Sequence, residues 1–255
     1  MPRIALILLC LSLAATSQTK KPKSASSGTA SKAAPAVKAS DVVIHTTAGD
    51  LKCTLFPDQA PTAVANFVGL ANGTKNWHNP MAAGKIVHGK PLYDGVIFHR
   101  VIPEFMIQGG DPSGTGSGDV GFEFADELHT DLIFDKPGRL AMANRGANTN
   151  SSQFFITEKE VPFLNPCFRE GGCPELRRGK NEGYTIFGQC DDASVELVKK
   201  IARMPRGAND RPNDPVKIIH IEVPKAGKSP VAKPVTKPAP SKTKTTTAPK
   251  SSVPN

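Results

Sequence analysis

The stretch from Phe98 to Asp111 constrains the fold of this chain more than any other, because it places a cation and an amide among large apolar side chains. Two runs with the alternation of β-strands lie on either side of Pro103. Side chains of a strand alternate between faces, so Arg100 shares a surface with Met106 and Gln108 if the break shifts the register by one residue. The stretch therefore predicts either a guanidinium above an apolar shelf or a core hairpin with an exposed Arg.

Both ends of the 255-residue chain differ in composition from its middle. Residues 1–17 hold a short apolar run that ends in small residues; it is too short to span a bilayer and is typical of a signal peptide. Residues 18–40 form a Lys/Ser/Ala-rich linker, and residues 224–255 form a Lys/Pro/Thr-rich tail. Neither has a periodic apolar face, so we expect both to be disordered. We expect one domain at 41–223 in an exported protein, periplasmic or extracellular.

The positive net charge of +9 belongs to the ends of the chain. Of 32 Lys and Arg residues, 6 lie in residues 1–40 and 7 in residues 224–255, where there is no Asp or Glu. Residues 41–223 therefore hold 19 basic and 23 acidic residues, which gives no support for a nucleic-acid partner. The basic ends are suited to weak contact with anionic envelope components, although solubilising linkers of this composition are commoner.

The middle segment reads as a series of short strands with two helices. The first predicted elements are a hairpin of 42–47 and 51–56 around a Gly49-Asp50 turn, a helix at 61–71 and a long loop at 75–91. Strands follow at 139–144, 153–157 and 184–188, then a helix at 193–204 and a strand at 216–223. In this last strand Ile219, Ile221 and Val223 face one way. Short strands without alternating helices predict a mainly β fold, an antiparallel barrel capped by two helices.

Three kinds of chemistry are disfavoured by the motifs. The run Gly114 to Gly118 lacks the Lys-Ser/Thr ending and the following helix of a phosphate loop, so we expect a mobile surface loop. The six His residues show no spacing typical of metal ligands, so no metal site is expected. No Gly-x-Ser-x-Gly motif marks a serine hydrolase.

Four cysteines follow the predicted signal peptide. Cys167 and Cys173 are separated by five residues in an irregular loop, and an exported protein meets an oxidising environment, so we expect them to form a disulfide. Cys53 and Cys190 lie in different predicted strands. We expect buried free thiols there, with pairing as the alternative.

Several long motifs together resemble the cyclophilin-type peptidyl-prolyl isomerases. They are Phe98-His99-Arg100-Val101-Ile102-Pro103, Phe105-Met106-Ile107-Gln108-Gly109-Gly110-Asp111, Leu140-Ala141-Met142-Ala143-Asn144 and Asn148-Thr149-Asn150-Ser151-Ser152-Gln153-Phe154-Phe155-Ile156-Thr157. The resemblance runs in order from about Val42 to Val223. It implies a closed eight-stranded antiparallel β-barrel capped by two α-helices, no cofactor, and an outer groove for a proline-containing peptide.

The resemblance also implies roles for individual residues. Arg100 matches the family's catalytic Arg. The residues that match the proline pocket and the groove for the peptide backbone are Phe105, Met106, Gln108, Ala143, Asn144, Gln153, Phe155, Phe163, Leu164 and Tyr184. We expect the partners to be unfolded or flexible proline-containing polypeptides, and the protein to be a monomer.

This chain departs from the best-known eukaryotic members at three places. Phe163 replaces a Trp at the pocket edge, and Tyr184 replaces a His of the groove. Both replacements resemble those of bacterial relatives and bear on inhibitor affinity more than on turnover. The loop from Pro166 to Gly183 is longer than the family's usual turn and carries Cys167 and Cys173.

Three functions remain open at this point. The first is an isomerase that accelerates rotation about X-Pro bonds in exported proteins. The second is a module of the same fold that binds proline-rich clients without catalysis. The third is an envelope interaction protein that acts through its basic ends. Arg100 favours the enzyme, since a pure binding module does not need a cation at the prolyl nitrogen.

Overall fold

The computed structural model describes residues 41–176 and 178–224. The predicted signal peptide, the linker 18–40 and the tail beyond Pro224 lie outside the described residues and remain predictions.

An eight-stranded antiparallel sheet is the main feature of the described residues, and its strand order is β10-β1-β2-β9-β7-β8-β6-β5. Two α-helices and a separate pair of short strands accompany it. The bounds are β1 Asp41–Thr46, β2 Gly49–Leu55, α1 Pro61–Ala71, β3 Trp77–Asn79, β4 Lys85–Val87, β5 Arg100–Ile102, β6 Met106–Gly109, β7 Arg139–Met142, β8 Phe154–Thr157, β9 Ile186–Cys190, α2 Asp192–Ala202 and β10 Ile218–Glu222.

The sheet curls into a barrel, and the segment before β5 meets the start of β10 through several main-chain hydrogen bonds, among them Ile218 amide to Val96 carbonyl and Gly95 amide to Ile218 carbonyl, both at 2.8 Å. Ile97, before β5, bridges Lys217, before β10, and the amide of Phe98 donates to the carbonyl of Val216 at 2.9 Å. No ladder joins β5 to β10 in the described residues. The predicted mainly β fold with two helices is confirmed, although "closed" slightly overstates the contact between the edges.

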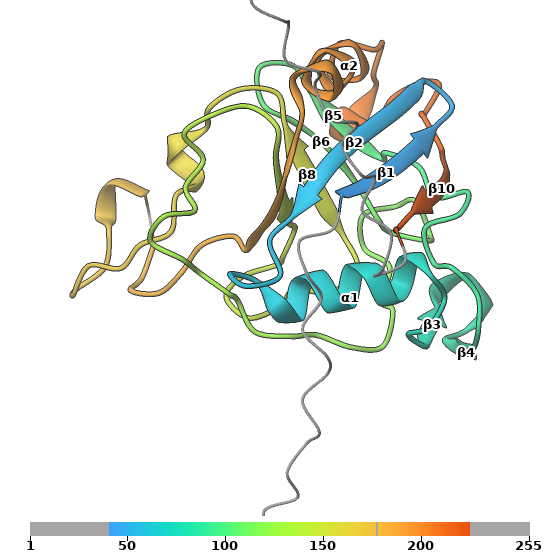
Figure 1. Ribbon diagram of the computed structural model, residues 1–255, viewed down its shortest axis with the longest axis horizontal. Helices are drawn as coiled ribbons and strands as arrows, with labels where there is room; N and C mark the ends of the chain where they lie inside the picture. Colours follow the sequence, from blue (N-terminus) through green and yellow to red (C-terminus); the bar gives the residue numbers. More distant parts are fainter. Residues whose placement is uncertain (1–40, 177, 225–255) are drawn as a thin grey trace, which may run out of the picture. The chain divides into compact units, whose positions relative to one another are not determined.

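The two helices lie on opposite sides of the strands (Figure 1). Helix α1 begins with Pro61 and receives its cap from a distant side chain, because the Glu127 carboxylate accepts from the amides of Thr62 and Ala63, both at 2.9 Å. Helix α2 begins one residue earlier than predicted, since the Asp191 side chain accepts from the amide of Ser194 at 2.8 Å.

Two local predictions in the N-terminal half were wrong. The first hairpin turns at Thr47-Ala48, because Thr46 pairs with Gly49 and its hydroxyl donates to the Gly49 carbonyl at 2.6 Å. The segment 75–91, expected to be a loop, contains the antiparallel pair β3 and β4.

Strand β10 also differs from its predicted facing pattern. Ile218 and Ile221 are buried, whereas Ile219 is 57% exposed. Across the ladder to β1, His45 pairs with His220 and Thr46 pairs with Ile218, so Ile219 is an extra residue. A bulge of this kind changes which residues face inward, and strict alternation fails there.

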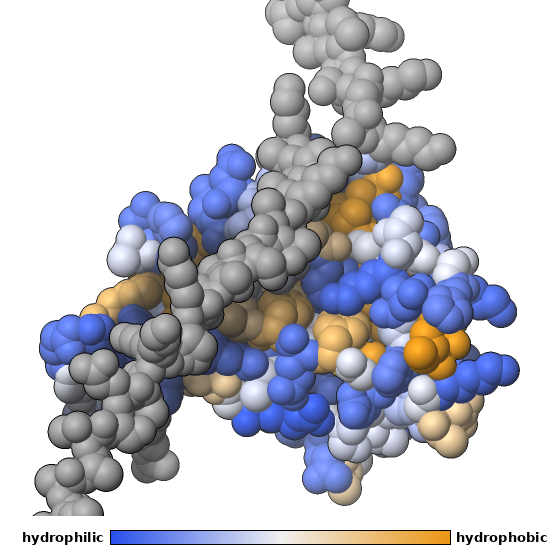
Figure 2. Space-filling view, turned by 90° about the horizontal axis from the view of Figure 1, so that it is seen from below, coloured by the Kyte–Doolittle hydropathy of each residue, from blue (hydrophilic) through white to orange (hydrophobic). Residues whose placement is uncertain are grey.

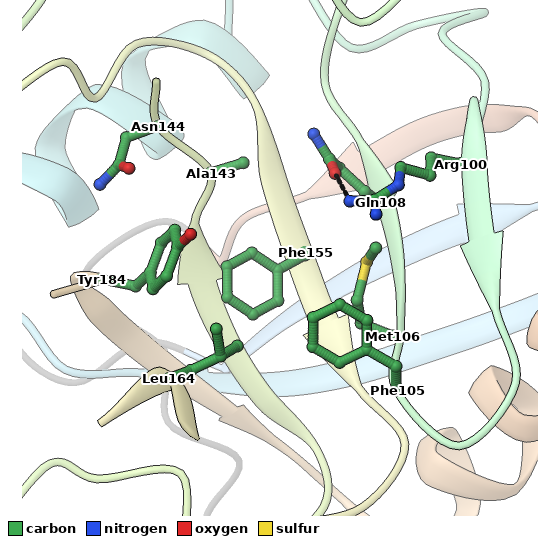
Figure 3. Close-up of a pocket in the computed structure, with 9 residues that line it drawn as sticks. All are labelled: Arg100, Phe105, Met106, Gln108, Ala143, Asn144, Phe155, Leu164 and Tyr184. Atoms are coloured by element: carbon green, nitrogen blue, oxygen red, sulfur yellow. Dashed lines mark hydrogen bonds between the residues drawn. The ribbon is translucent and has the colours of Figure 1, made fainter. Parts of the chain in front are cut away.

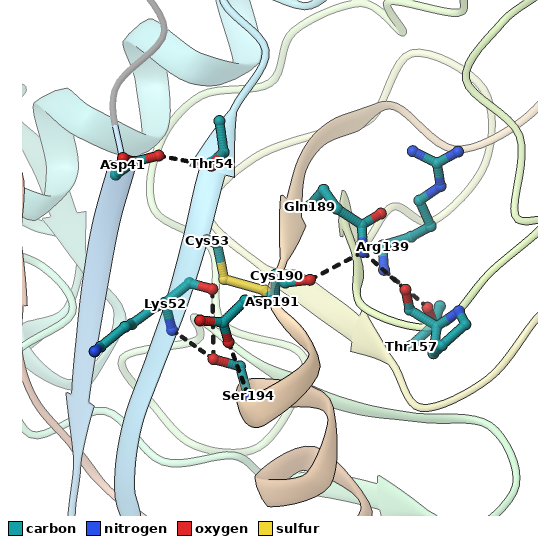
Figure 4. The surroundings of a disulfide bond; sticks show 11 residues. Asp41, Lys52, Cys53, Thr54, Arg139, Thr157, Gln189, Cys190, Asp191 and Ser194 are labelled. Atoms are coloured by element: carbon teal, nitrogen blue, oxygen red, sulfur yellow. Dashed lines mark hydrogen bonds between the residues drawn. A yellow bond between two sulfur atoms is a disulfide. The ribbon is translucent and has the colours of Figure 1, made fainter. Parts of the chain in front are cut away.

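The four cysteines of the described residues form two disulfides. The Cys167–Cys173 bond confirms the prediction. The expectation of free thiols at Cys53 and Cys190 was wrong, because these residues are opposite each other in the β2–β9 ladder (Figure 4). The flanking main-chain bonds, such as Asp191 amide to Lys52 carbonyl at 3.0 Å, make this a non-hydrogen-bonded pair, in which facing residues lie closest.

Alternation along the strands separates two apolar cores. One fills the barrel, where Ile107 and Ile156 point inward and belong to the same cluster as buried residues of α1 and α2. The second lies on the outer face of β6, β8 and β7, and comprises Met106, Phe134, Ala141, Phe155, Val161, Leu164 and Ile186. On the face shown in Figure 2, apolar residues form separate patches among hydrophilic ones. The outer core is therefore the floor of any groove on the outer face of β6, β8 and β7.

Candidate active site

The hairpin of β5 and β6 sets the geometry of the site. Arg100 pairs with Gln108 and Ile102 pairs with Met106, so their side chains share one face. The turn between them contains Glu104 in the left-handed region at φ 60°. This arrangement supplies the shift of register that the first of the two alternatives required, and Arg100 lies on the same face as Met106 and Gln108.

A cavity of about 180 Å³ lies on this outer face (Figure 3). Nine of the eleven predicted site residues line it: Arg100, Phe105, Met106, Gln108, Ala143, Asn144, Phe155, Leu164 and Tyr184. Arg100 and Gln108 are at one end, and Asn144 and Tyr184 are at the other (Figure 3). Residues from separate parts of the chain thus meet around one small, half-open pocket.

The floor of this pocket is apolar and rigidly packed. Met106 is 2% exposed and Phe155 is 5% exposed, so only small parts of these side chains face solvent. The Phe155 ring lies between Phe134, stacked at 5.8 Å, and Tyr184, edge to face at 5.6 Å. Such contacts restrict the ring, and the pocket is preformed for an apolar ring of a ligand.

Polar side chains hold the Arg100 end in place. Arg100 Nη1 donates to Gln108 Oε1 at 3.5 Å, and Gln108 Nε2 donates to Gln153 Oε1 at 3.0 Å. Gln153 Nε2 in turn donates to the carbonyl of Gly116 at 2.9 Å. Asp210 Oδ2 lies 3.6 Å from Arg100 Nε. The guanidinium is thereby oriented from two sides while its side chain remains 42% exposed.

The loop that supports Gln153 is ordered by a buried carboxylate. Asp111 accepts hydrogen bonds from the amides of Gly116 and Gly118, at 2.7 and 3.1 Å, and from the Ser113 hydroxyl. Burial alone would raise the pKa of Asp111, but these hydrogen bonds hold it below its usual range. The loop from Gly114 to Gly118, expected to be mobile, is therefore constrained. Its Gly116 and Gly118 amides already donate to Asp111, so they are not available to bind a phosphate.

Two predicted residues lie outside the main cavity. Gln153 lines a neighbouring cavity of about 130 Å³, which shares Gln108, Ala143 and Asn144 with the first. Phe163 lies at the rim, 55% exposed, with its ring 5.3 Å from that of Phe105. The Asn144 side chain donates to the carbonyl of Gly183 at 3.3 Å, so its amide group holds the groove together.

Sequence reasoning missed Asp210 and assigned no role to His99. Asp210 comes from a distant loop, where it and Asn209 have positive φ, and no motif marks it. His99 is buried behind Arg100, and its Nδ1 has no hydrogen-bond partner in the described residues. Burial lowers the pKa of His99, and the charges of Arg211 and Arg100 lower it further against the attraction of Asp111. His99 is thus neutral near pH 7.

Within residues 41–176 and 178–224 there is no cluster of three or more His, Cys, Asp or Glu side chains that could hold a metal. The same residues include no helix with the length and apolar character needed to cross a membrane.

Comparison with known proteins identifies the class. The model of the cyclophilin-type peptidyl-prolyl cis-trans isomerase family matches residues 41–223. Peptidyl-prolyl cis-trans isomerase A of Mycobacterium tuberculosis is 50% identical over 181 residues, which cover 71% of this chain and 90% of that protein. Isomerase B of Streptomyces anulatus is 43% identical over 180 residues, covering 70% and 91%.

Solved structures agree. A cyclophilin-type isomerase of Cryptosporidium parvum, crystallised in the presence of the dipeptide Ala-Pro, has a TM-score of 0.55 and 35% identity, and covers 72% of this chain and 99% of that chain. The chain belongs to the cyclophilin-type peptidyl-prolyl cis-trans isomerase family. It is an enzyme that catalyses cis-trans isomerisation of X-Pro bonds.

Proposed function

We propose that this isomerase acts on X-Pro bonds of exported or envelope proteins during their folding, and that Arg100 carries the chemistry. The observation that supports Arg100 most strongly is its position at the edge of an apolar pocket, oriented by Gln108 and Asp210.

The reaction needs no nucleophile. Rotation about an X-Pro bond crosses a barrier of about 18–20 kcal/mol, because amide resonance is lost in the twisted state. As the bond twists, the prolyl nitrogen regains a lone pair that can accept a hydrogen bond. A donor aimed at that nitrogen binds the twisted state better than either planar isomer, which is the condition for catalysis. Arg100 suits this role, since its charge is permanent and its fork can also contact the adjacent carbonyl.

The apolar floor anchors one side of the rotating bond. Phe105, Met106, Phe155 and Leu164 would bury the proline ring, with a gain of about 25 cal/mol for each Å² of apolar surface removed from water. Gln108, Gln153 and the Asn144 main chain would hold the peptide on the other side. The structure of the Cryptosporidium parvum relative obtained in the presence of Ala-Pro supports proline as the residue that enters the pocket.

Export is supported by two independent features. Residues 1–17 have the pattern of a signal peptide, and two disulfides occur in the described residues. Disulfides are rare in the cytosol, where thiols are kept reduced. The basic ends then provide weak attachment to anionic envelope components.

Expression with the native N-terminus tests the cellular part of the proposal. We expect a mature protein that begins close after residues 14–17 and is recovered outside the cytoplasm; recovery of the uncleaved chain in the cytoplasm would contradict export. Isomerase rate and retention on envelope material, compared between the fragment 41–224 and the full chain, separate catalysis from attachment. We expect the fragment and the full chain to have the same isomerase rate and the fragment to be retained less strongly. A peptide that binds to the protein but is not isomerised faster would indicate a binding module.

A further inference from the structure

The long loop from Pro166 to Gly183 is tied into a compact unit next to the pocket. Cys167 and Cys173 are joined by a disulfide. Cys167 donates its amide to the carbonyl of Glu182 at 2.9 Å, and Cys173 donates to the carbonyl of Arg178 at 2.8 Å. The two half-cystines therefore pair with Glu182 and Arg178, farther along the loop. The disulfide fixes the position of Arg178 relative to Glu182.

This pairing places Arg178 against the ring of Tyr184, which lines the pocket. The guanidinium carbon of Arg178 lies 4.9 Å from the centroid of the Tyr184 ring, within the range of a cation–π contact. Tyr184 lines the cavity, and its ring meets Phe155 of the floor edge to face. Only one aromatic ring thus separates a positive charge from the space that receives the peptide.

Arg178 differs from the other two cations that the structure describes in this loop. Arg169 is paired with Glu175, and Lys180 is paired with Glu170. Among the described residues no carboxylate lies within ion-pair distance of Arg178. The charges of Arg169 and Lys180 are compensated inside the loop, so among the described cations of the loop Arg178 is the one without a carboxylate partner.

We propose that Arg178 is a specificity-determining residue that favours substrates with Asp or Glu immediately before the proline, and that the Cys167–Cys173 disulfide holds it in place. The inference rests on the isomerase activity and on the placement of the peptide proposed above. Tyr184 is next to Ala143 and Asn144, at the end opposite Arg100 (Figure 3). The Asn144 main chain is one of the groups proposed above to hold the peptide before the proline. At physiological ionic strength the Debye length is about 8 Å. The charge of Arg178, behind one ring, is therefore not fully screened from the peptide residue before the proline.

The expected preference is modest, because the interaction is partly exposed to solvent. Contacts of this kind correspond to a factor of about two to five in an equilibrium or rate constant. The charge of Arg178 lies away from the rotating bond, so it changes the binding free energy of the planar substrate and that of the twisted state by the same amount. The preference should therefore appear in KM and leave kcat nearly unchanged.

Tetrapeptides Ala-X-Pro-Phe with X as Glu, Ala or Lys test the proposal on the full, oxidised chain. We expect wild-type kcat/KM to be highest for Glu and lowest for Lys. Arg178→Gln should lower the Glu-to-Lys ratio about two- to fivefold, Arg178→Glu should invert it, and Arg178→Lys should retain it. The matched control is Arg169→Gln, which removes the same charge from the same loop and should leave the ratio unchanged.

The disulfide is tested with the double variant Cys167→Ser/Cys173→Ser, which should lower the ratio as Arg178→Gln does while turnover of the Ala peptide persists. A ratio that stays the same in Arg178→Gln and Arg178→Glu, with turnover intact, would overturn the role of Arg178 and leave the isomerase function standing. Absence of wild-type turnover on all three peptides would instead overturn the isomerase function, and this inference with it.

Discussion

The Glu158 carboxylate accepts a hydrogen bond from the backbone amide of Glu104 at 2.5 Å, and so joins the end of β8 to the turn between β5 and β6. Glu158 is 2% exposed and is also contacted by Arg203 Nη1 at 2.8 Å. Glu104 has a positive φ, which a residue with a side chain adopts at some cost. The anchored turn carries Phe105 directly into the proline pocket, so a buried carboxylate outside the pocket, paired with the half-exposed Arg203, sets the position of the pocket wall.

Removal of this anchor should loosen the pocket and weaken substrate binding. We expect Glu158→Ala to lower the free energy of unfolding by about 1–3 kcal/mol, because the Glu104 amide loses its acceptor and Arg203 loses a buried partner. KM for an X-Pro peptide should rise more than kcat falls, since Arg100 remains in place. Urea unfolding and steady-state kinetics measure the two effects. Glu160→Ala, which changes an exposed neighbour, is the control; equal effects of both variants would contradict the role of Glu158.

Both disulfides should be present in protein exported to an oxidising compartment. Without reductant, Cys53, Cys167, Cys173 and Cys190 should resist alkylation in the native and in the unfolded chain. In the loop-entropy model, the bond between Cys167 and Cys173 contributes about 2 kcal/mol, and the bond between Cys53 and Cys190, which are 137 residues apart, contributes about 5 kcal/mol. Reduction should therefore lower Tm mainly through Cys53–Cys190. Rapid labelling of either pair in the oxidised protein would show that the pair is not bonded.

Burial of neutral His99 predicts a loss of stability in mild acid. Its pKa is lowered in the folded state, so below about pH 6.5 the unfolded chain binds a proton that the folded chain does not. The contribution of His99 is fully present above that pH and declines as the pH falls toward the lowered folded pKa. The free energy of unfolding, measured by urea at several pH values, should fall less steeply between pH 7 and 5 in His99→Gln than in the wild type. If the free energy of unfolding fell equally steeply with pH in His99→Gln and in the wild type, the loss of stability would not come from His99.

Phe163 should limit the affinity for family inhibitors of the cyclic-peptide class. It is exposed at the rim and packs on Phe105, but its ring offers no hydrogen-bond donor. An indole adds a ring N–H, and one such bond contributes about 0.5–1.5 kcal/mol. Phe163→Trp should thus tighten cyclosporin-type binding about tenfold, with a much smaller change in the isomerase rate on small peptides. Inhibitor titrations of both proteins in one assay measure this. An unchanged inhibition constant would assign the affinity to Tyr184 or to the loop 166–183.

Local patterns predicted the two extended runs that carry Arg100 and Gln108, but left two alternatives for their register; the structure shows Arg100 paired with Gln108. Helix α1 was also predicted correctly, since Pro61 begins it and its apolar face has the period of a helix. The resemblance to the cyclophilin family supplied the remaining walls of the pocket, which come from strands that pair only in the folded chain.

Other features depend on contacts that no local pattern encodes. The Cys53–Cys190 disulfide requires β2 and β9 to be neighbours, and these strands are far apart in sequence. The bulge at Ile219 arises from the register between β10 and β1, which alternation within β10 cannot reveal. Asp210 reaches Arg100 from a loop whose sequence gives no sign of that proximity.

The most direct test of the proposed chemistry compares rate and affinity in variants of Arg100. We expect Arg100→Ala to lower kcat for an Ala-Pro-containing peptide by about 10²–10³, as the loss of one transition-state donor does elsewhere, while Kd for the same peptide changes by no more than a few-fold. Arg100→Lys should retain part of the rate, because it keeps the charge but loses the planar fork. Rates from an exchange or coupled assay and Kd from titration should be measured under one set of conditions. If Kd rises by the same factor as the rate falls, or if Arg100→Ala keeps wild-type turnover, Arg100 does not act through the twisted amide.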